Sequence, residues 1–210
     1  MASLVCVIVA YLIGSVSFAI LASWIFRLPD PRSYGSGNPG ATNVLRSGKK
    51  AAALFTLLGD AAKGLVTVVL ARYLAPSFGF GEATVAACAV AVFLGHLYPL
   101  YFAFKGGKGV ATALGVLLGL NGWIAAIGLV VFVAVTVLTR YVSLASVIAA
   151  AVLMILAPVV AGPGADSVAI AVISVLVIWR HRANIGRLRS GTESRLSLRR
   201  NDPPSADRAA

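Results

Sequence analysis

Residues 2–26 read ASLVCVIVAYLIGSVSFAILASWIF, a run of apolar and small residues without a single charged side chain. A helix rises about 1.5 Å per residue, so a run of this length can cross a hydrocarbon core of about 30 Å. No basic stretch comes before the run and no small-residue cleavage site ends it, whereas Arg27 and Arg32 follow it directly. We therefore expect a retained first transmembrane helix and not a signal peptide.

The remainder of the chain has the same apolar character. Its 210 residues are 59% hydrophobic and 12% charged, and the mean hydropathy is +0.91. This composition excludes an ordinary soluble domain and predicts an all-α fold, a polytopic transmembrane helical bundle. The formal charge is +11, but the basic residues fall between apolar runs and form no basic domain. We therefore expect them to set the membrane topology, and we predict membrane lipid and no nucleic acid among the partners.

Hydropathy and helix-breaking residues predict about seven spans, of which the fourth is too short to cross a bilayer and is expected to be a half-length helix. Their approximate limits are 3–26, 51–75, 82–103, 109–120, 122–139, 141–161 and 165–180. An N-terminus outside the membrane places nearly all basic residues on the other side, so we predict a cytoplasmic C-terminus. We assign residues 1–198 to one transmembrane domain and residues 199–210 to a disordered tail.

The first polar segment, residues 35–46, reads GSGNPGATNVLR and follows the first span. Its glycines free backbone amides, and the side chains of Ser36, Asn38, Thr42 and Asn43 offer hydrogen bonds. Arg46 adds a planar cation that suits a phosphate group. A flexible turn with polar caps explains the glycines alone equally well.

The second polar segment, residues 95–112, reads GHLYPLYFAFKGGKGVAT. Lys105, Gly106, Gly107, Lys108 and Gly109 come just before the short fourth helix, where successive amides and two lysines predict an anion nest. A Walker A loop is excluded because Gly109 follows Lys108 where Ser or Thr is needed. A basic loop that only sets the topology is the alternative reading of the lysines.

The third polar segment, residues 181–193, reads HRANIGRLRSGTE and follows the last span. Helical spacing places His181 and Asn184 near one face. A histidine at a membrane boundary is more often an interfacial hydrogen-bonding residue than a general base, so its type alone assigns no role. Glu193 lies among arginines and is explained by holding their geometry.

Two charged residues, Asp60 and Lys63, lie inside the second span. Their spacing of three places them on one helix face, so we predict an ion pair. A charged residue inside a membrane is energetically costly and generally has a function. Both a structural ion pair and direct contact with substrate remain as explanations of this pair.

Together the three segments closely resemble the signature segments of the bacterial acyl-phosphate:glycerol-3-phosphate acyltransferases, in the same order. The resemblance implies transfer of an acyl group from acyl phosphate to glycerol 3-phosphate, giving 1-acyl-glycerol 3-phosphate (lysophosphatidic acid) and inorganic phosphate. It implies no metal and no cofactor, and a functional link to the enzyme that makes acyl phosphate. The implied location is the bacterial cytoplasmic membrane, with the active site facing the cytoplasm.

The resemblance also implies roles for individual residues. Catalytic roles fall on Ser36, Arg46, His181 and Asn184. Substrate-binding roles fall on the other matched positions, which are Asn38, Thr42, Asn43, His96, Lys105, Gly106, Gly107, Lys108, Gly109, Thr112, Arg187 and Glu193. The glycerol hydroxyl is expected to attack the donor directly, with either His181 or the donor's own phosphate as proton acceptor.

Other classes fit the sequence less well. Acyltransferases that use thioester donors carry a His-x4-Asp pair, and neither His96 nor His181 has an aspartate five residues later. Membrane alcohol phosphotransferases need several aspartates for divalent metals, and Asp60 is the only acidic residue in the interior of a span. A transporter for an anion or organophosphate is the non-enzymatic alternative, although its polar residues should extend across the bilayer.

Overall fold

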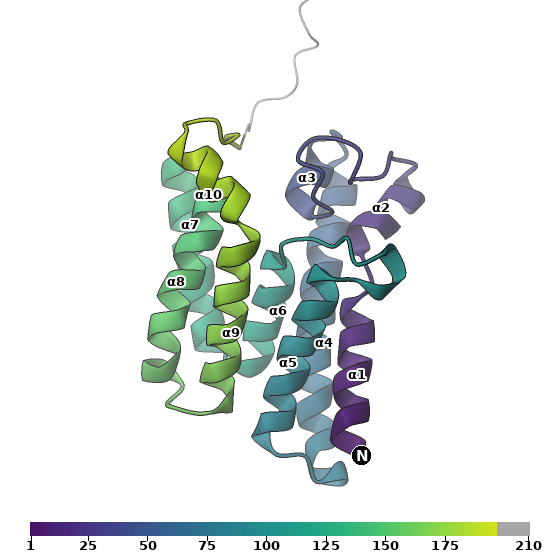
Figure 1. Ribbon diagram of the computed structural model, residues 1–210, viewed down its shortest axis with the longest axis vertical. Helices are drawn as coiled ribbons and strands as arrows, with labels where there is room; N and C mark the ends of the chain where they lie inside the picture. Colours follow the sequence, from purple (N-terminus) through teal and green to yellow (C-terminus); the bar gives the residue numbers. More distant parts are fainter. Residues whose placement is uncertain (197–210) are drawn as a thin grey trace, which may run out of the picture.

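The computed structural model describes residues 1–196, and the described chain forms helices and no β-strand (Figure 1). The prediction of an all-α bundle is confirmed. The predicted tail, residues 199–210, lies outside the described residues. In chain order the helices are α1 (Ala2–Gly14), α2 (Phe18–Phe26), α3 (Ala41–Leu45), α4 (Lys50–Phe78), α5 (Glu82–Leu97), the 3-10 turn η1 (Leu100–Phe102), α6 (Val110–Leu120), α7 (Gly122–Thr139), α8 (Val142–Val160), α9 (Ala165–Arg180) and α10 (Arg182–Arg189).

The first predicted span is two helices. The chain breaks between α1 and α2, where the side chain of Ser17 accepts a hydrogen bond from the Ile20 amide and so caps α2. A break inside lipid leaves carbonyl groups without partners unless the protein supplies them. Lys63 does so here, because its Nζ donates to the Val16 carbonyl at 2.6 Å.

The described helices allow five or six crossings by length and composition. Five stretches are long and apolar enough to cross a membrane, counting α1 and α2 together, and α9 with α10 forms a sixth if this pair, bent by 52°, is one span. Helix α6 has 11 residues, as expected for the half-length helix. The total of about seven spans and the orientation of the termini stay predictions.

Helix α6 lies against α4 at backbone contact distance. A Cβ at Gly115 would overlap the Ala61 carbonyl, and one at Gly64 would overlap the Thr112 carbonyl. Small residues at such crossings let helices approach closely without side chains between them. This contact fixes α6 beside the charged pair of α4.

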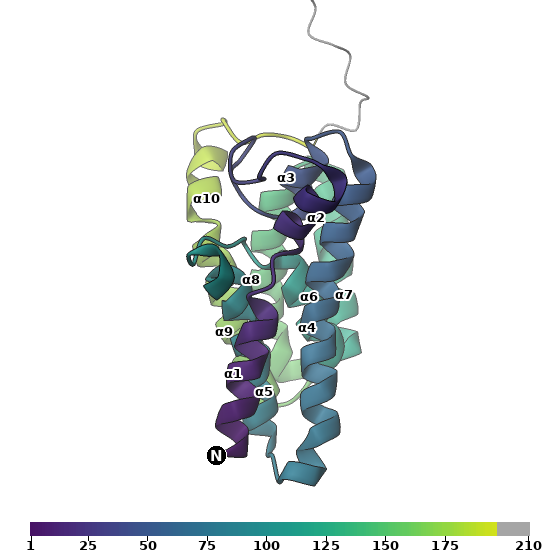
Figure 2. The same ribbon diagram turned by 90° about the vertical axis from the view of Figure 1, so that its right-hand side faces the viewer.

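The three polar segments lie toward the same end of the bundle. Figures 1 and 2 show α3 and α10 at the end opposite the N-terminus, with the connection that precedes α6 set lower, part-way down the helices. The short α6 therefore begins part-way down the bundle, below the segments around α3 and α10.

Candidate functional site

One large cavity joins the three polar segments. Its volume is about 1560 Å³, and it extends from these segments down between α6, α7, α8 and α9. Its polar part includes most of the residues singled out in the sequence, namely Ser36, Asn38, Thr42, Asn43, Arg46, His96, Lys108, Gly109, His181, Asn184, Arg187 and Glu193. Its deeper wall is apolar and includes Leu117, Leu129, Phe132, Leu153 and Ile173.

The first segment is held in shape by Asn43. Its Oδ1 accepts from the Ser36 amide at 2.9 Å, and its Nδ2 donates to the carbonyls of Pro31 and Tyr34 at 2.7 and 3.1 Å. The Asn43 amide is therefore occupied by the loop itself, and the residue shapes the site from within. The hydroxyl of Ser36 is left on the cavity wall.

The second and third segments meet in a hydrogen-bond network. Lys108 donates to Asn184 Oδ1, and Asn184 Nδ2 donates to Glu193 Oε1 at 2.6 Å. Ser143 on α8 donates to the same oxygen, and Arg187 Nε donates to Oε2, both at 2.7 Å. Each polar side chain in this network is thus held in position by a hydrogen bond to at least one other side chain of the network.

This network sets the charges at the cavity. Burial opposes ionisation of Glu193, but the hydrogen bonds from Ser143, Asn184 and Arg187 outweigh it and lower the pKa of that carboxyl. Burial and nearby arginines lower the pKa of Lys108 to about 8, although Glu193 acts in the opposite direction. Lys108 is therefore cationic at neutral pH and loses its charge as the pH rises through about 8.

His181 has a defined tautomer. Its Nδ1 lies 2.8 Å from the Val177 carbonyl, and its side chain is buried at the cavity wall. A carbonyl oxygen only accepts hydrogen bonds, so Nδ1 carries the proton and Nε2 of the neutral ring is an acceptor. Nε2 is thus the ring atom that can accept a proton, but burial lowers the pKa of His181 to about 4, so the ring is a weak base.

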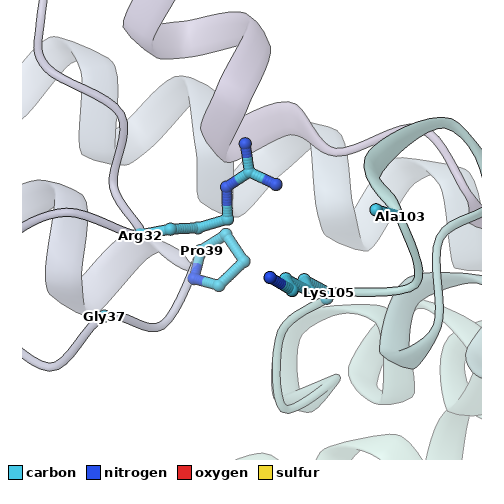
Figure 3. A pocket seen from close by; sticks show the side chains of 6 residues that line it. Arg32, Gly37, Pro39, Ala103 and Lys105 are labelled. Atoms are coloured by element: carbon cyan, nitrogen blue, oxygen red, sulfur yellow. The ribbon is translucent and has the colours of Figure 1, made fainter.

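The two lysines of the second segment line different cavities. Lys108 lines the large cavity, whereas Lys105 lines a smaller one of about 460 Å³ with Arg32, Gly37 and Pro39. Figure 3 shows Lys105 extending toward Pro39, with Arg32 beside it. The sequence grouped both lysines in one anion nest, and the structure separates them.

Arg180 holds this loop and was not singled out from the sequence. Its guanidinium donates to the carbonyls of Gly106 and Gly107 at 3.0 Å and lies 5.7 Å from the centre of the Tyr98 ring. These contacts fix the turn between the two lysines, which line different cavities. The sequence signal was weak, because an arginine at the end of an apolar helix is expected from topology alone.

The remaining three predicted residues do not line the large cavity. Gly106 lines the small cavity, and Gly107 and Thr112 line neither. The Thr112 hydroxyl is buried and has no hydrogen-bond partner among the described residues. Within residues 1–196 no group of three or more His, Cys, Asp or Glu side chains is arranged to hold a metal ion.

Comparison with known proteins shows the family to which the chain belongs. Residues 4–191 match a family model described as glycerol-3-phosphate acyltransferase. A protein of that name from Nitrosospira multiformis is 54% identical over 190 residues, covering 90% of this chain and 94% of the relative. Another from Paraburkholderia phytofirmans is 52% identical over 210 residues, covering 100% and 96%. The chain belongs to the glycerol-3-phosphate acyltransferase family.

Solved structures agree with this membership. Crystals of PlsY (YgiH), an integral membrane glycerol 3-phosphate acyltransferase, contain a chain that is 38% identical to this one. Its glycerol 3-phosphate form matches with a TM-score of 0.86, covering 94% of this chain and 96% of that chain, and its lysophosphatidic acid form matches with 0.84. Family membership favours a membrane-integral acyltransferase over the organophosphate transporter that the sequence left open.

Proposed function

We propose that the protein transfers a fatty acyl group from acyl phosphate to the sn-1 hydroxyl of glycerol 3-phosphate, releasing lysophosphatidic acid and inorganic phosphate. The observation that carries the proposal is the division of one cavity into a cationic part and an apolar part. Family membership supplies the acceptor. The donor is inferred from the cavity and from the absence of a His-x4-Asp pair in the sequence.

Both substrates carry a phosphate, and the cationic part of the cavity suits such groups. Arg46, Lys108 and Arg187 all line it, and guanidinium groups bind phosphate through two parallel hydrogen bonds. The apolar wall between α6 and α9 suits the acyl chain, since each buried CH₂ contributes roughly 0.8 kcal/mol. A single site therefore accepts a molecule with an anionic head and an apolar tail.

The chemistry needs alignment more than activation. An acyl phosphate is a mixed anhydride, so attack of the glycerol oxygen on the acyl carbon forms the ester while the bond to the phosphate oxygen breaks. The electron pair leaves with inorganic phosphate. The hydroxyl proton passes to His181 Nε2, on a residue that lines the cavity, or to the phosphate of the donor.

Ser36 acts as a hydrogen-bond donor in this proposal and not as a nucleophile. Among the described residues its hydroxyl makes no hydrogen bond to a histidine or a carboxylate, so a base that would activate it is not in place. Its position on the cavity wall suits stabilisation of the negative charge that develops on the acyl oxygen.

We place this site on the cytoplasmic face of the bacterial cytoplasmic membrane. The support is the charge asymmetry at the end of the bundle that carries the site. Arg32, Arg46 and Arg140 belong to connections there, Lys50 begins α4, and Arg187 lies on the short α10. The enzyme that makes acyl phosphate would then supply the donor from the same side.

A donor comparison tests the proposal. Purified protein in detergent receives glycerol 3-phosphate with either acyl phosphate or acyl-CoA of the same chain length, and the lipid products are separated. We expect turnover with acyl phosphate to be at least about tenfold faster, because the cavity recognises the phosphate that leaves. Comparable rates with the two donors would refute the proposed donor.

A further inference from the structure

Three ionisable side chains are buried together beneath the site, and the proposed chemistry does not use them as a group. Asp60 and Lys63 on α4 and His96 on α5 are 2%, 5% and 7% exposed. Lys63 Nζ lies 2.9 Å from Asp60 Oδ1, and His96 Nδ1 lies 3.5 Å from the same oxygen. The predicted ion pair is thus confirmed, and it has a third member. Such groups are costly inside a membrane and usually have a function.

The lysine end of this group has a structural task. Lys63 satisfies the Val16 carbonyl at the break between α1 and α2. That task explains a buried ammonium group and a carboxylate to neutralise it. It does not explain why the Nδ1 of a histidine from another helix lies 3.5 Å from the same carboxylate oxygen.

The histidine end contacts the loop of the second segment. The His96 carbonyl accepts a hydrogen bond from the Gly107 amide at 3.2 Å. A Cβ on Gly107 would overlap Nε2 of the His96 ring, so the ring edge lies directly against this glycine. The orientation of the ring therefore limits where the loop can lie.

Asp60 and His96 also border the large cavity, as does Lys108, which follows Gly107. A change in the ring would move the loop, and the loop carries the ammonium group that donates to Asn184, which in turn donates to Glu193. The path from Asp60 to the substrate cavity thus has three contacts, each of them seen in the structure.

We propose that Asp60 is a positioning residue: its carboxylate fixes the ring of His96, and through that ring the Gly106 and Gly107 turn that places Lys108 for the phosphate of a substrate. The inference rests on the proposed function of the large cavity as the site of both phosphates. It assigns Asp60 a role in substrate affinity that a structural ion pair does not have.

The test removes both charges of the ion pair at once. The single variant Asp60→Asn would leave the Lys63 ammonium buried without its partner. Its effect on activity would therefore be mixed with a loss of stability. The double variant Asp60→Asn, Lys63→Gln has no buried charge to compensate and keeps side chains of similar size. We expect its thermal stability in detergent to stay near that of the wild type. We expect its apparent KM for glycerol 3-phosphate to rise about tenfold, with kcat changed less than about threefold.

A second ion pair provides the matched control. Arg72 on α4 and Asp166 on α9 pair at 2.7 Å toward the opposite end of the bundle. The double variant Arg72→Gln, Asp166→Asn should leave the KM for glycerol 3-phosphate unchanged. A purely structural role for Asp60 would lower the active fraction, and hence the maximal rate, with no change in KM. A wild-type KM in the Asp60 double variant would therefore overturn the proposal.

A further variant keeps the test decisive if the double variant fails to assemble. His96→Phe retains a ring and the backbone carbonyl that binds Gly107 but cannot pair with Asp60, and we expect the same rise in KM. An unchanged KM there would also refute the proposal. All values are measured with whichever acyl donor supports wild-type turnover. A failure of acyl phosphate as donor would then refute the proposed function, whereas the comparison of KM values between variants and wild type would still test the role of Asp60.

Discussion

Replacing Gly106 with alanine should lower acyltransferase activity by more than about a hundredfold. A Cβ at this position would overlap the His96 carbonyl and lie 2.6 Å from the Leu97 carbonyl. Backbone atoms cannot turn away as a flexible side chain can, so the loop that carries Lys105 and Lys108 must move. A displacement of about 1 Å at a reacting site can cost a factor of about 10² in rate.

The control for this variant is Gly186→Ala in α10, where a Cβ would meet no atom within 4 Å. Gly186 belongs to the third segment, and alanine favours the helix there, so near-normal activity is expected. Activity is measured in membranes and normalised to the amount of folded protein. If Gly106→Ala kept more than a third of the wild-type activity, the loop would be less tightly fixed than the structure indicates.

Replacing Glu193 with alanine should also reduce activity by more than about a hundredfold. The carboxylate accepts from Ser143, Asn184 and Arg187, and hydrogen bonds of charged groups are worth about 1.5 to 3 kcal/mol each. Its loss releases Arg187 and leaves Asn184, the partner of Lys108, without its own anchor. Two of the cations at the cavity, Lys108 and Arg187, would then lose their positions.

Glu193→Gln separates the charge from the geometry. Its amide oxygen can still accept from Ser143 and Asn184, but the charge that pairs with Arg187 is gone, so we expect an intermediate loss of about tenfold. Glu82→Ala, which removes an exposed carboxylate at the start of α5, serves as the control and should be neutral. Equal activities of Glu193→Ala and wild type would show that the network does not hold the site.

Much of this arrangement could be predicted from the sequence, because the signals were local. The apolar runs predicted the helices, the 12-residue run predicted the half-length α6, and the spacing of Asp60 and Lys63 predicted their pair. The three polar segments were identified by residue type, and most of their singled-out residues line one cavity. Bilayer thickness and helix periodicity are strong constraints, so these predictions needed no knowledge of tertiary contacts.

The errors concern contacts between distant parts of the chain. No local pattern shows that Arg180 binds the carbonyls of Gly106 and Gly107, and without that contact Lys105 and Lys108 cannot be assigned to separate cavities. The sequence did not predict the break between α1 and α2. That break depends on a contact between distant residues, because the free carbonyl of Val16 accepts from Lys63, 47 residues away. Nothing in the sequence indicated that the Asn43 side chain holds its own loop, and its predicted contact with substrate stays a prediction.

The central claim is that one cavity holds both substrates and that the acyl group passes between them directly. The most direct test is mass spectrometry of the intact protein, quenched during turnover with acyl phosphate and glycerol 3-phosphate. Direct transfer predicts that the protein keeps its unmodified mass while lysophosphatidic acid accumulates. An acyl adduct on Ser36 that forms and decays at the rate of turnover would contradict the account.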